Sequence, residues 1–423
     1  GLLLLGSATD TYTLSGLLDK QSVLAQHSFY LPAVLLILLG CFTKSAQVPF
    51  HFWLPNAMSA PTPVSAYLHS ATMVKAGIYL LARLSPVLAG TDLWHYTLIT
   101  AGGVTALLGA LLALQQTDLK AILAYTTISA LGLLVTMLGI GTPYAIKAML
   151  FFLLAHALYK GALFLVAGAI DHSTGTRDVT KLYRLGTGMR VSGWAAGLAA
   201  LSMAGVFPFL GFVSKELLYE ASLKNYFLLG INMVAGIAFV AVALQLSYGI
   251  FWSSRNETTR LQHKPSSILY LPPLILGIVG LGLGFSVEKV PALLLRDAAK
   301  AVLGGAGAEM DVALWHGFTP VLALSIITLL LGVGVYSLLR KIQAARHRLL
   351  QLYRFGPDQL YHRLFDGFLH YSKRFTGWLQ NGYLRSYVVY IMLFYCGLLL
   401  YAIWRDAPGL AIQTRLHLLK EIR

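Results

Sequence analysis

The chain has 423 residues, of which 57% are hydrophobic and only 12% are charged, whereas a soluble domain has about a quarter of its residues charged. This composition excludes an ordinary soluble fold. Lysine and arginine outnumber aspartate and glutamate by 32 to 17, but the basic residues fall mostly between apolar runs, which indicates membrane topology and argues against a nucleic-acid partner.

Apolar runs long enough to cross a bilayer recur along the whole chain. A helix needs roughly 20 apolar residues to span a hydrocarbon core of about 30 Å, and an open sheet cannot satisfy its backbone groups in lipid. The runs therefore predict an all-α, polytopic membrane protein with about ten transmembrane helices. These spans are expected near residues 29–53, 64–84, 95–116, 120–140, 144–170, 191–213, 226–252, 268–287, 318–339 and 384–404.

The basic residues between spans predict the orientation. One side of the membrane receives Lys120, the cluster from Arg177 to Arg190 and the stretch from Arg340 to Arg385, and the other side receives a thinner set. The richer side should be cytoplasmic. The sequence thus predicts a multi-pass membrane protein whose basic loops lie in the cytoplasm.

Residues 341–383 form an amphipathic segment, because aromatic residues and leucines recur there at helical spacing between basic residues. Two interpretations stay open: a helix resting on lipid headgroups, or a lateral strut against neighbouring subunits. Leu2 to Leu5 resemble the tail of an earlier apolar run, so we expect N-terminal spans to be missing. The predicted parts are a truncated span and loop (1–28), a transmembrane core (29–340), the lateral helix (341–383), a last span (384–404) and a C-terminal tail (405–423).

The first span contains Lys44, five residues before Pro49. A charged residue at the centre of a bilayer costs about 2.5–3.5 kcal/mol on insertion scales, so a lysine there is expected to be functional. Pro49 has no N–H for the carbonyl of Ser45, which predicts a broken helix beside Lys44. The alternative is a lysine near a helix end that reaches the interface.

Two later spans each combine a histidine with a lysine. His69 and Lys75 are six residues apart, about 600° of helical rotation, so they do not share a face. His69 alone could be a packing residue, but Lys75 adds a second buried cation. His156 and Lys160 are four residues apart and share one helical face. Such a pair can accept and release protons.

Two further lysines have a carboxylate close by in sequence. Asp118 and Lys120 lie at the junction of two spans, where the aspartate could simply cap a helix or could join a proton relay. Lys215 and Glu216 follow Pro208, which predicts a second broken helix; ordinary ion pairing is the alternative for these two residues. Two broken helices with lysines are typical of inverted-repeat transporters.

Motifs of enzymes are not found. The chain has no Walker sequence, no paired-cysteine motif and no glycine-rich nucleotide turn, and Cys41 and Cys396 lie in separate apolar runs. We therefore expect no cofactor and no enzymatic activity, and the sequence defines no metal ligand set.

Four stretches resemble the proton-pumping antiporter-like family, which includes the NuoL-type subunit of respiratory complex I and the A-type subunit of the Mrp sodium/proton antiporters. The similar stretches are 44–66, 118–129, 156–164 and 211–216. The resemblance implies that Lys44 is the channel lysine of the first half, His69 a relay histidine, Lys160 the central lysine and Lys215 the lysine of the second broken helix. It also implies a glutamate partner for Lys44 on an earlier span, one of the N-terminal spans that we expect to be missing. Phe152 stands where some relatives have a histidine.

The run from Ile170 to Asp178 and the presence of Lys75 are similar to the A-type subunit of Mrp antiporters rather than to complex I subunits. The signature residues of this run are Asp171, His172, Arg177 and Asp178. The implied function is a proton-translocating subunit of a multisubunit sodium/proton antiporter. The implied partners are other membrane subunits, the lipid bilayer, Na⁺ and H⁺.

Two alternative functions stay open. The first is a proton-pumping subunit of a complex I-type NADH:quinone oxidoreductase, and the second is a structural scaffold whose charged residues only form ion pairs.

Overall fold

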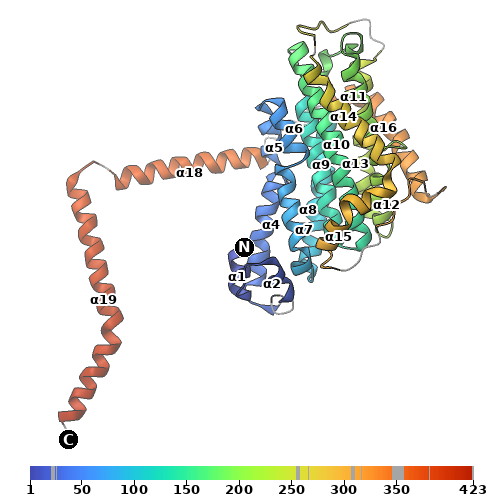
Figure 1. Cartoon of the computed structure of the whole chain (residues 1–423). Coiled ribbons are helices and arrows are strands. Elements are labelled where there is room, and N and C mark those ends of the chain that lie inside the picture. Colours follow the sequence, from blue (N-terminus) through green and yellow to red (C-terminus); the bar gives the residue numbers. More distant parts are fainter. Residues whose placement is uncertain are drawn as a thin grey trace. The chain divides into compact units, whose positions relative to one another are not determined.

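The computed structural model describes residues 1–20, 24, 26–253, 258–264, 266–305, 310–315, 317–344, 357–380 and 382–421. The chain divides into two units, Gly1–Pro357 and Asp358–Arg423, which are described separately. The described residues form helices and turns together with one isolated bridge between Asp118 and Asp178, which confirms the all-α prediction (Figure 1).

The first unit is a bundle of helices joined mostly by short turns. In chain order these helices are α1 (Leu2–Thr9), α2 (Leu14–Asp19), α4 (Tyr30–Lys44), α5 (Trp53–Asn56), α6 (Thr62–Ser70), α7 (Met73–Leu88), α8 (Asp92–Gln115), α9 (Leu119–Ile140), α10 (Pro143–Thr174), α11 (Arg190–Ala204), α12 (Leu210–Ser222), α13 (Tyr226–Leu244), α14 (Ser267–Phe285), α15 (Arg296–Val302) and α16 (Pro320–Ala344). Alpha13 continues into a π-helical turn, Gln245–Gly249.

Eight helical segments among the described residues are long and apolar enough to cross a membrane, and each corresponds to a predicted span; one of them, Thr62–Leu88, comprises α6 and α7. The two other predicted spans are divided: 29–53 becomes α4 and α5, and 191–213 becomes α11 and the start of α12. The two predicted breaks are therefore present. The span predicted at 64–84 is also interrupted, between α6 and α7, which the sequence did not indicate.

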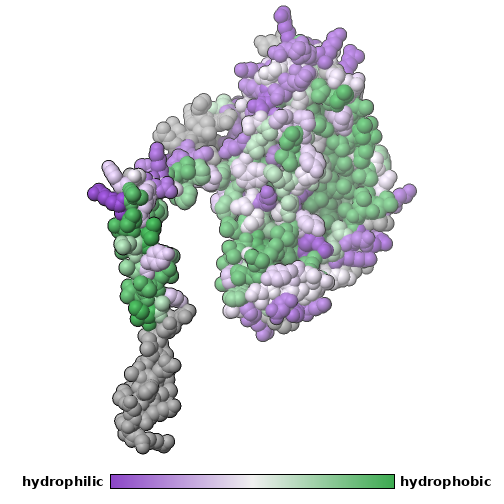
Figure 2. All heavy atoms as spheres, turned by 60° about the vertical axis from the view of Figure 1, so that its left-hand side comes forward, coloured by the Kyte–Doolittle hydropathy of each residue, from purple (hydrophilic) through white to green (hydrophobic). Residues whose placement is uncertain are grey.

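The centre of the first unit is the pair α9 and α10, in which 89% and 72% of the residues of the most apolar stretch are buried. Alpha8 packs closely on α9: a Cβ on Gly132 would lie 2.4 Å from the backbone nitrogen of Ala106, so the site requires glycine. By contrast, α14 and α16 are only 22% and 28% buried. Figure 2 shows a broad apolar surface on this unit between polar ends, as expected for a protein that crosses a membrane.

The second unit consists of α18 (Pro357–Leu379) and α19 (Leu384–Glu421). Alpha18 carries aromatic side chains at helical spacing, interleaved with basic residues, as expected for an amphipathic helix. The start predicted for this helix is wrong, since residues 341–344 belong to α16, and residues 345–356 lie outside the described part of the chain. Alpha19 includes a potential span, Leu384–Ile403, and continues beyond it as a helix.

Candidate functional site

The second broken helix places Lys215 against its own break. Alpha11 ends at Ala204, and Gly205 follows with φ +67°, a left-handed conformation that glycine adopts without a steric penalty. Pro208 has no N–H to offer the carbonyl of Ala204. The ammonium of Lys215, on α12, donates to the carbonyl oxygens of Gly205 at 2.8 Å and of Ala204 at 3.4 Å. A buried lysine thus supplies the donors that the broken backbone lacks.

The first broken helix is built differently, and the expectation that Lys44 is buried there is wrong. Lys44 is the last residue of α4, and its side chain is exposed in this chain. The carbonyl of Ser45, which Pro49 leaves without a helical donor, accepts a hydrogen bond from the side-chain amide of Gln47 at 2.9 Å. The break is therefore satisfied by Gln47 and not by the amine of Lys44. A cation at the carboxyl end of a helix is favourable in any case.

A third break separates His69 on α6 from Lys75 on α7. The hydroxyl of Ser70 donates to the carbonyl of Ala66, and the hydroxyl of Thr72 donates to the carbonyl of Tyr67 at 3.1 Å. Such side-chain to backbone bonds compete with helical ones and bend helices. The residues between His69 and Lys75 include no proline or glycine, which is why the sequence did not indicate this break.

His69 and Lys75 both point into the bundle, against α10. His69 is buried, its ring centroid lies 6.0 Å from that of Phe164, and its Nδ1 has no hydrogen-bond partner among the described residues. The ammonium of Lys75 is buried too and donates to the carbonyl of Leu153 at 3.2 Å. The two residues that sequence placed on different helical faces therefore both meet α10, because the helix between them is broken.

His156 and Lys160 lie at the centre of α10 and are fully buried, as predicted for a pair on one face. Lys160 donates to the carbonyl of Leu123 at 3.2 Å and to the hydroxyl of Thr126, both on α9. Neither ring nitrogen of His156 has a hydrogen-bond partner among the described residues. Since buried polar atoms are normally satisfied, these nitrogens are positions where ordered water can bind.

A small cavity connects the centre of α10 with the second broken helix. Its volume is about 20 Å³, enough for one water molecule, and its lining includes Tyr159, Lys215 and Asn232. Tyr159 is fully buried and lies next to Lys160 in sequence, with its ring edge-on to His156 at 5.4 Å. The sequence interpretation missed Tyr159, because a tyrosine in an apolar run looks like an ordinary core residue.

Glu216 faces a second, acidic cavity rather than pairing with Lys215. No ion pair joins these two neighbours among the described residues. Glu216 and Glu220, one helical turn apart, instead line a cavity of about 370 Å³ between α12 and the amino end of α16. One carboxylate oxygen of Glu216 is buried without a hydrogen-bond partner, and Glu220 accepts a hydrogen bond from Tyr144 of α10. The sequence interpretation missed Glu220, although its spacing of four residues from Glu216 places the two carboxylates on one face of a helix.

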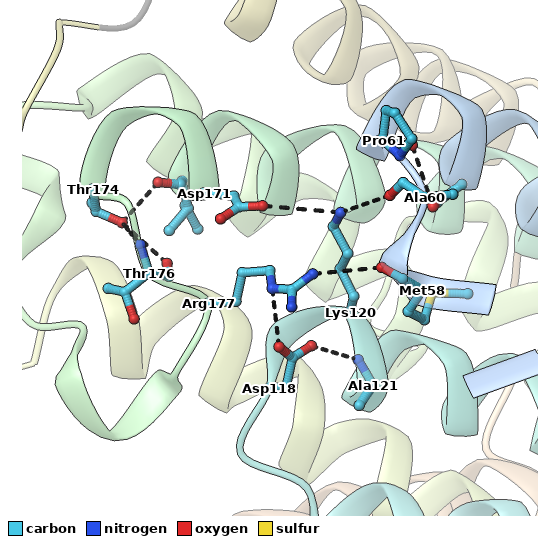
Figure 3. Close-up of polar contacts among 12 residues, drawn as sticks. Met58, Ala60, Pro61, Asp118, Lys120, Ala121, Asp171, Thr174, Thr176 and Arg177 are labelled. Carbon is cyan, nitrogen blue, oxygen red and sulfur yellow. Dashed lines mark hydrogen bonds and ion pairs between the residues drawn. The ribbon is translucent and has the colours of Figure 1, made fainter. Parts of the chain in front are cut away.

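At the opposite end of α10, four charged residues form two ion pairs (Figure 3). Nε of Arg177 lies 3.1 Å from Oδ2 of Asp118, and Nζ of Lys120 lies 3.9 Å from Oδ2 of Asp171. Asp118 also caps α9, because its Oδ1 accepts from the backbone N–H of Ala121 at 3.0 Å. The predicted capping role of Asp118 is therefore confirmed, and it is combined with an ion pair. Lys120 is buried, and Asp171 and Arg177 are partly exposed.

Two backbone hydrogen bonds attach the signature run to the start of α9. The N–H of Leu119 donates to the carbonyl of Arg177, and the N–H of Val179 donates to the carbonyl of Thr117, each at 2.9 Å. Asp178 turns its side chain away and caps a short 3₁₀ turn, Val179–Lys181, through Thr180. The ring of His172 lies 5.8 Å from that of His263. Among the described residues, no group of three or more His, Cys, Asp or Glu side chains could hold a metal ion.

Helices that break within the membrane and bury lysine and histidine side chains define a class of protein, the ion-translocating membrane proteins. The chain belongs to the family described as NADH:quinone oxidoreductase/Mrp antiporter, transmembrane, whose model matches residues 1–240. This membership confirms the resemblance drawn from the sequence.

Individual relatives share both sequence and fold with the chain. The A-type subunit of the Na(+)/H(+) antiporter of Alkalihalophilus pseudofirmus is 36% identical over 448 residues, which cover 98% of this chain and 55% of that protein. A probable K(+)/H(+) antiporter A/B-type subunit of Rhizobium meliloti is 38% identical over 390 residues, which cover 90% of this chain and 39% of that protein. A solved chain of the Mrp complex from Dietzia sp. has a TM-score of 0.78 at 36% identity and covers 95% of this chain and 44% of that one. The chain spans about half the length of the curated relatives it matches.

Proposed function

We propose that this chain is a proton-translocating subunit of a multisubunit monovalent cation (Na⁺)/proton antiporter in a bacterial cell membrane. The observation that carries the proposal is the buried row formed by Lys75, His156, Lys160 and Lys215. Four basic side chains inside one helical bundle, with no carboxylate partner among the described ion pairs, are costly unless they have a function.

The row provides groups that can pass a proton along. The unpartnered nitrogens of His156 can take a proton on one side of the ring and release one on the other. Lys160 carries three donors, of which two are directed at Leu123 and Thr126 of α9. The water-sized cavity beside Tyr159 then supplies a step toward Lys215. His69, buried against Phe164, belongs to the same set.

Glu216 and its cavity serve as the outlet of the row. Lys215 lies at the break, and its neighbour Glu216 lines the acidic cavity. A proton released by Lys215 can pass to Glu216 and from there to water in the cavity. Lys44, which the resemblance assigns to the same path, is exposed at the end of α4 and stays a prediction from that resemblance.

The names of the similar proteins favour the antiporter over the complex I-type alternative, since relatives at 36–38% identity are antiporter subunits. One of these names carries Na⁺ and the other K⁺, which supports a monovalent cation as the exchanged ion, and we propose Na⁺. The remaining subunits of the complex are the proposed partners. The cavity lined by Glu216 and Glu220 has the charge to attract such cations.

The test is replacement of Lys160 by alanine in the full complex. We expect Na⁺-dependent dissipation of a pH gradient in everted vesicles to fall to background, while the amount of assembled complex is unchanged. Lys341→Ala, at an exposed lysine on α16, is the matched control and should transport normally. Normal transport by the Lys160→Ala complex would remove the relay, and transport that required NADH or quinone would select the complex I-type alternative.

A further inference from the structure

The segment 58–61, which leads into α6, is held by a charged side chain of α9 and by one of the loop that follows α10. Its backbone is extended at Ala60 and Pro61, between the 3₁₀ turn Ala57–Ser59 and α6. The N–H of Ala60 still bonds to the carbonyl of Ala57 at 3.3 Å, but the carbonyl of Ala60 turns toward the neighbouring elements. The carbonyl of Ala60 accepts from the ammonium of Lys120 at 3.1 Å, and the carbonyl of Met58 accepts from the guanidinium of Arg177 at 3.5 Å. Figure 3 shows both cations reaching this segment, Lys120 from the start of α9 and Arg177 from the loop after α10.

Each of these cations is itself held by a carboxylate. Arg177 is paired with Asp118, the cap of α9, and Lys120 is paired with Asp171 in the last turn of α10. The side chain of Lys120 is 4% exposed, so a lost partner would leave a buried charge uncompensated. The four residues, which we call the positioning cluster, therefore join the start of α9, the end of α10 and the segment before α6.

These three elements are the ones that hold the centre of the buried row. Alpha6 carries His69, α10 carries His156 and Lys160, and α9 supplies the two acceptors of Lys160. His69 follows Thr62, the first residue of α6, by seven residues, which is about 10 Å along the helix axis. The first residue of α6, Thr62, also packs tightly on α10: a Cβ on Gly168 would lie 2.9 Å from Cβ of Thr62. A shift of segment 58–61 is therefore carried along α6 to His69.

We infer that Asp118, Lys120, Asp171 and Arg177 are positioning residues that set the place of α6, and so of His69, against the central His156–Lys160 pair. Their side chains are committed to ion pairs and to backbone carbonyls at one end of the bundle. Lys120 lies six residues before Thr126, about 9 Å along α9 from the amine of Lys160. This inference rests on the proposed function, and it separates Asp118 and Lys120 from the relay with which the sequence grouped them.

The experiment uses the full complex and compares Arg177→Ala with Arg177→Lys. Lysine keeps the positive charge and a donor for Met58, whereas alanine removes both. We expect Arg177→Ala to lower the maximal rate of Na⁺-dependent proton exchange at least tenfold with little change in the Na⁺ concentration for half-maximal rate. Arg177→Lys should restore most of the rate. Asp118→Asn, which keeps a capping oxygen, is the second variant if the alanine complex does not assemble.

A distance measurement separates positioning from proton transfer. Spin labels at Tyr67→Cys on α6 and Tyr96→Cys on α8 occupy exposed sites, and α8 packs on α9. We expect the distance distribution between the labels to shift or broaden in Arg177→Ala and to return in Arg177→Lys. A reduced rate with an unchanged distance would place these residues in the proton path instead, and an unchanged rate would overturn the inference altogether.

Failure of the inference and failure of the proposed function give different results. If Lys160→Ala abolishes exchange while Arg177→Ala and Asp118→Asn retain it, the relay stands and the positioning cluster does not. If Lys160→Ala retains exchange, the proposed function fails whatever the cluster variants do.

Discussion

The ammonium of Lys215 donates a hydrogen bond to the carbonyl oxygen of Gly205, 2.8 Å away across the break between α11 and α12. One side chain therefore both stabilises a discontinuous backbone and occupies the proposed path. Its hydrogen bonds to the carbonyls of Ala204 and Gly205 offset part of the cost of burying the lysine. A substitution that keeps these donors but cannot release a proton therefore separates the structural role from the proposed transport role.

Lys215→Met and Lys215→Arg should separate these two roles. Methionine removes the donor and leaves the carbonyls of Ala204 and Gly205 unpaired, at about 1–3 kcal/mol for each. Arginine keeps donors but stays protonated. We expect both variants to lose proton exchange, and only the methionine variant to unfold at a lower temperature when the purified complex is heated with a thiol-reactive dye. Exchange by the arginine variant would contradict a role in proton transfer.

Lys160→Arg should fail in a similar way. Its guanidinium remains charged and cannot hand a proton on, and its planar head does not fit the two acceptors on α9 as an ammonium does. The expected result is assembled complex with background exchange in everted vesicles, next to normal exchange by Lys341→Arg. A Lys160→Arg complex that transports at more than about a tenth of the normal rate, a difference of about 1.4 kcal/mol in barrier, would argue against a mobile proton at this site.

His156→Leu should lose exchange without losing stability. Neither ring nitrogen of His156 has a protein partner among the described residues, so a leucine of similar size breaks no hydrogen bond and removes a buried polar group. We expect the thermal midpoint of the complex to stay the same or rise, while the exchange rate falls at least tenfold. A clear drop in the midpoint would instead show that the histidine is a structural residue.

Cysteine labelling can test the predicted orientation. Lys181 lies in the basic loop after α10, and Glu220 lies near the opposite, amino end of that helix, where it bonds to Tyr144; both are exposed. In intact cells, an impermeant maleimide should label Glu220→Cys but not Lys181→Cys, and a permeant reagent should label both. The reverse pattern would invert the topology. Gln351 of the amphipathic segment is also expected on the cytoplasmic side, but it lies outside the described residues.

The sequence by itself determined the features that depend on local chemistry. Apolar runs located the spans because about 20 apolar residues are needed to cross a bilayer, and Pro49 and Pro208 located two breaks because proline cannot donate to the preceding turn. The His156–Lys160 pair followed from helical spacing, and the capping role of Asp118 was one of two interpretations open at its junction.

The tertiary structure alone decided which partners these residues have. Gln47 rather than Lys44 satisfies the first break, whereas Lys215 satisfies the second, and Arg177 reaches Met58 across 119 positions of sequence. A long amine or guanidinium can extend to any carbonyl within several ångströms of its Cα. Which carbonyl that is depends on how distant helices pack, and neither spacing nor composition contains that information.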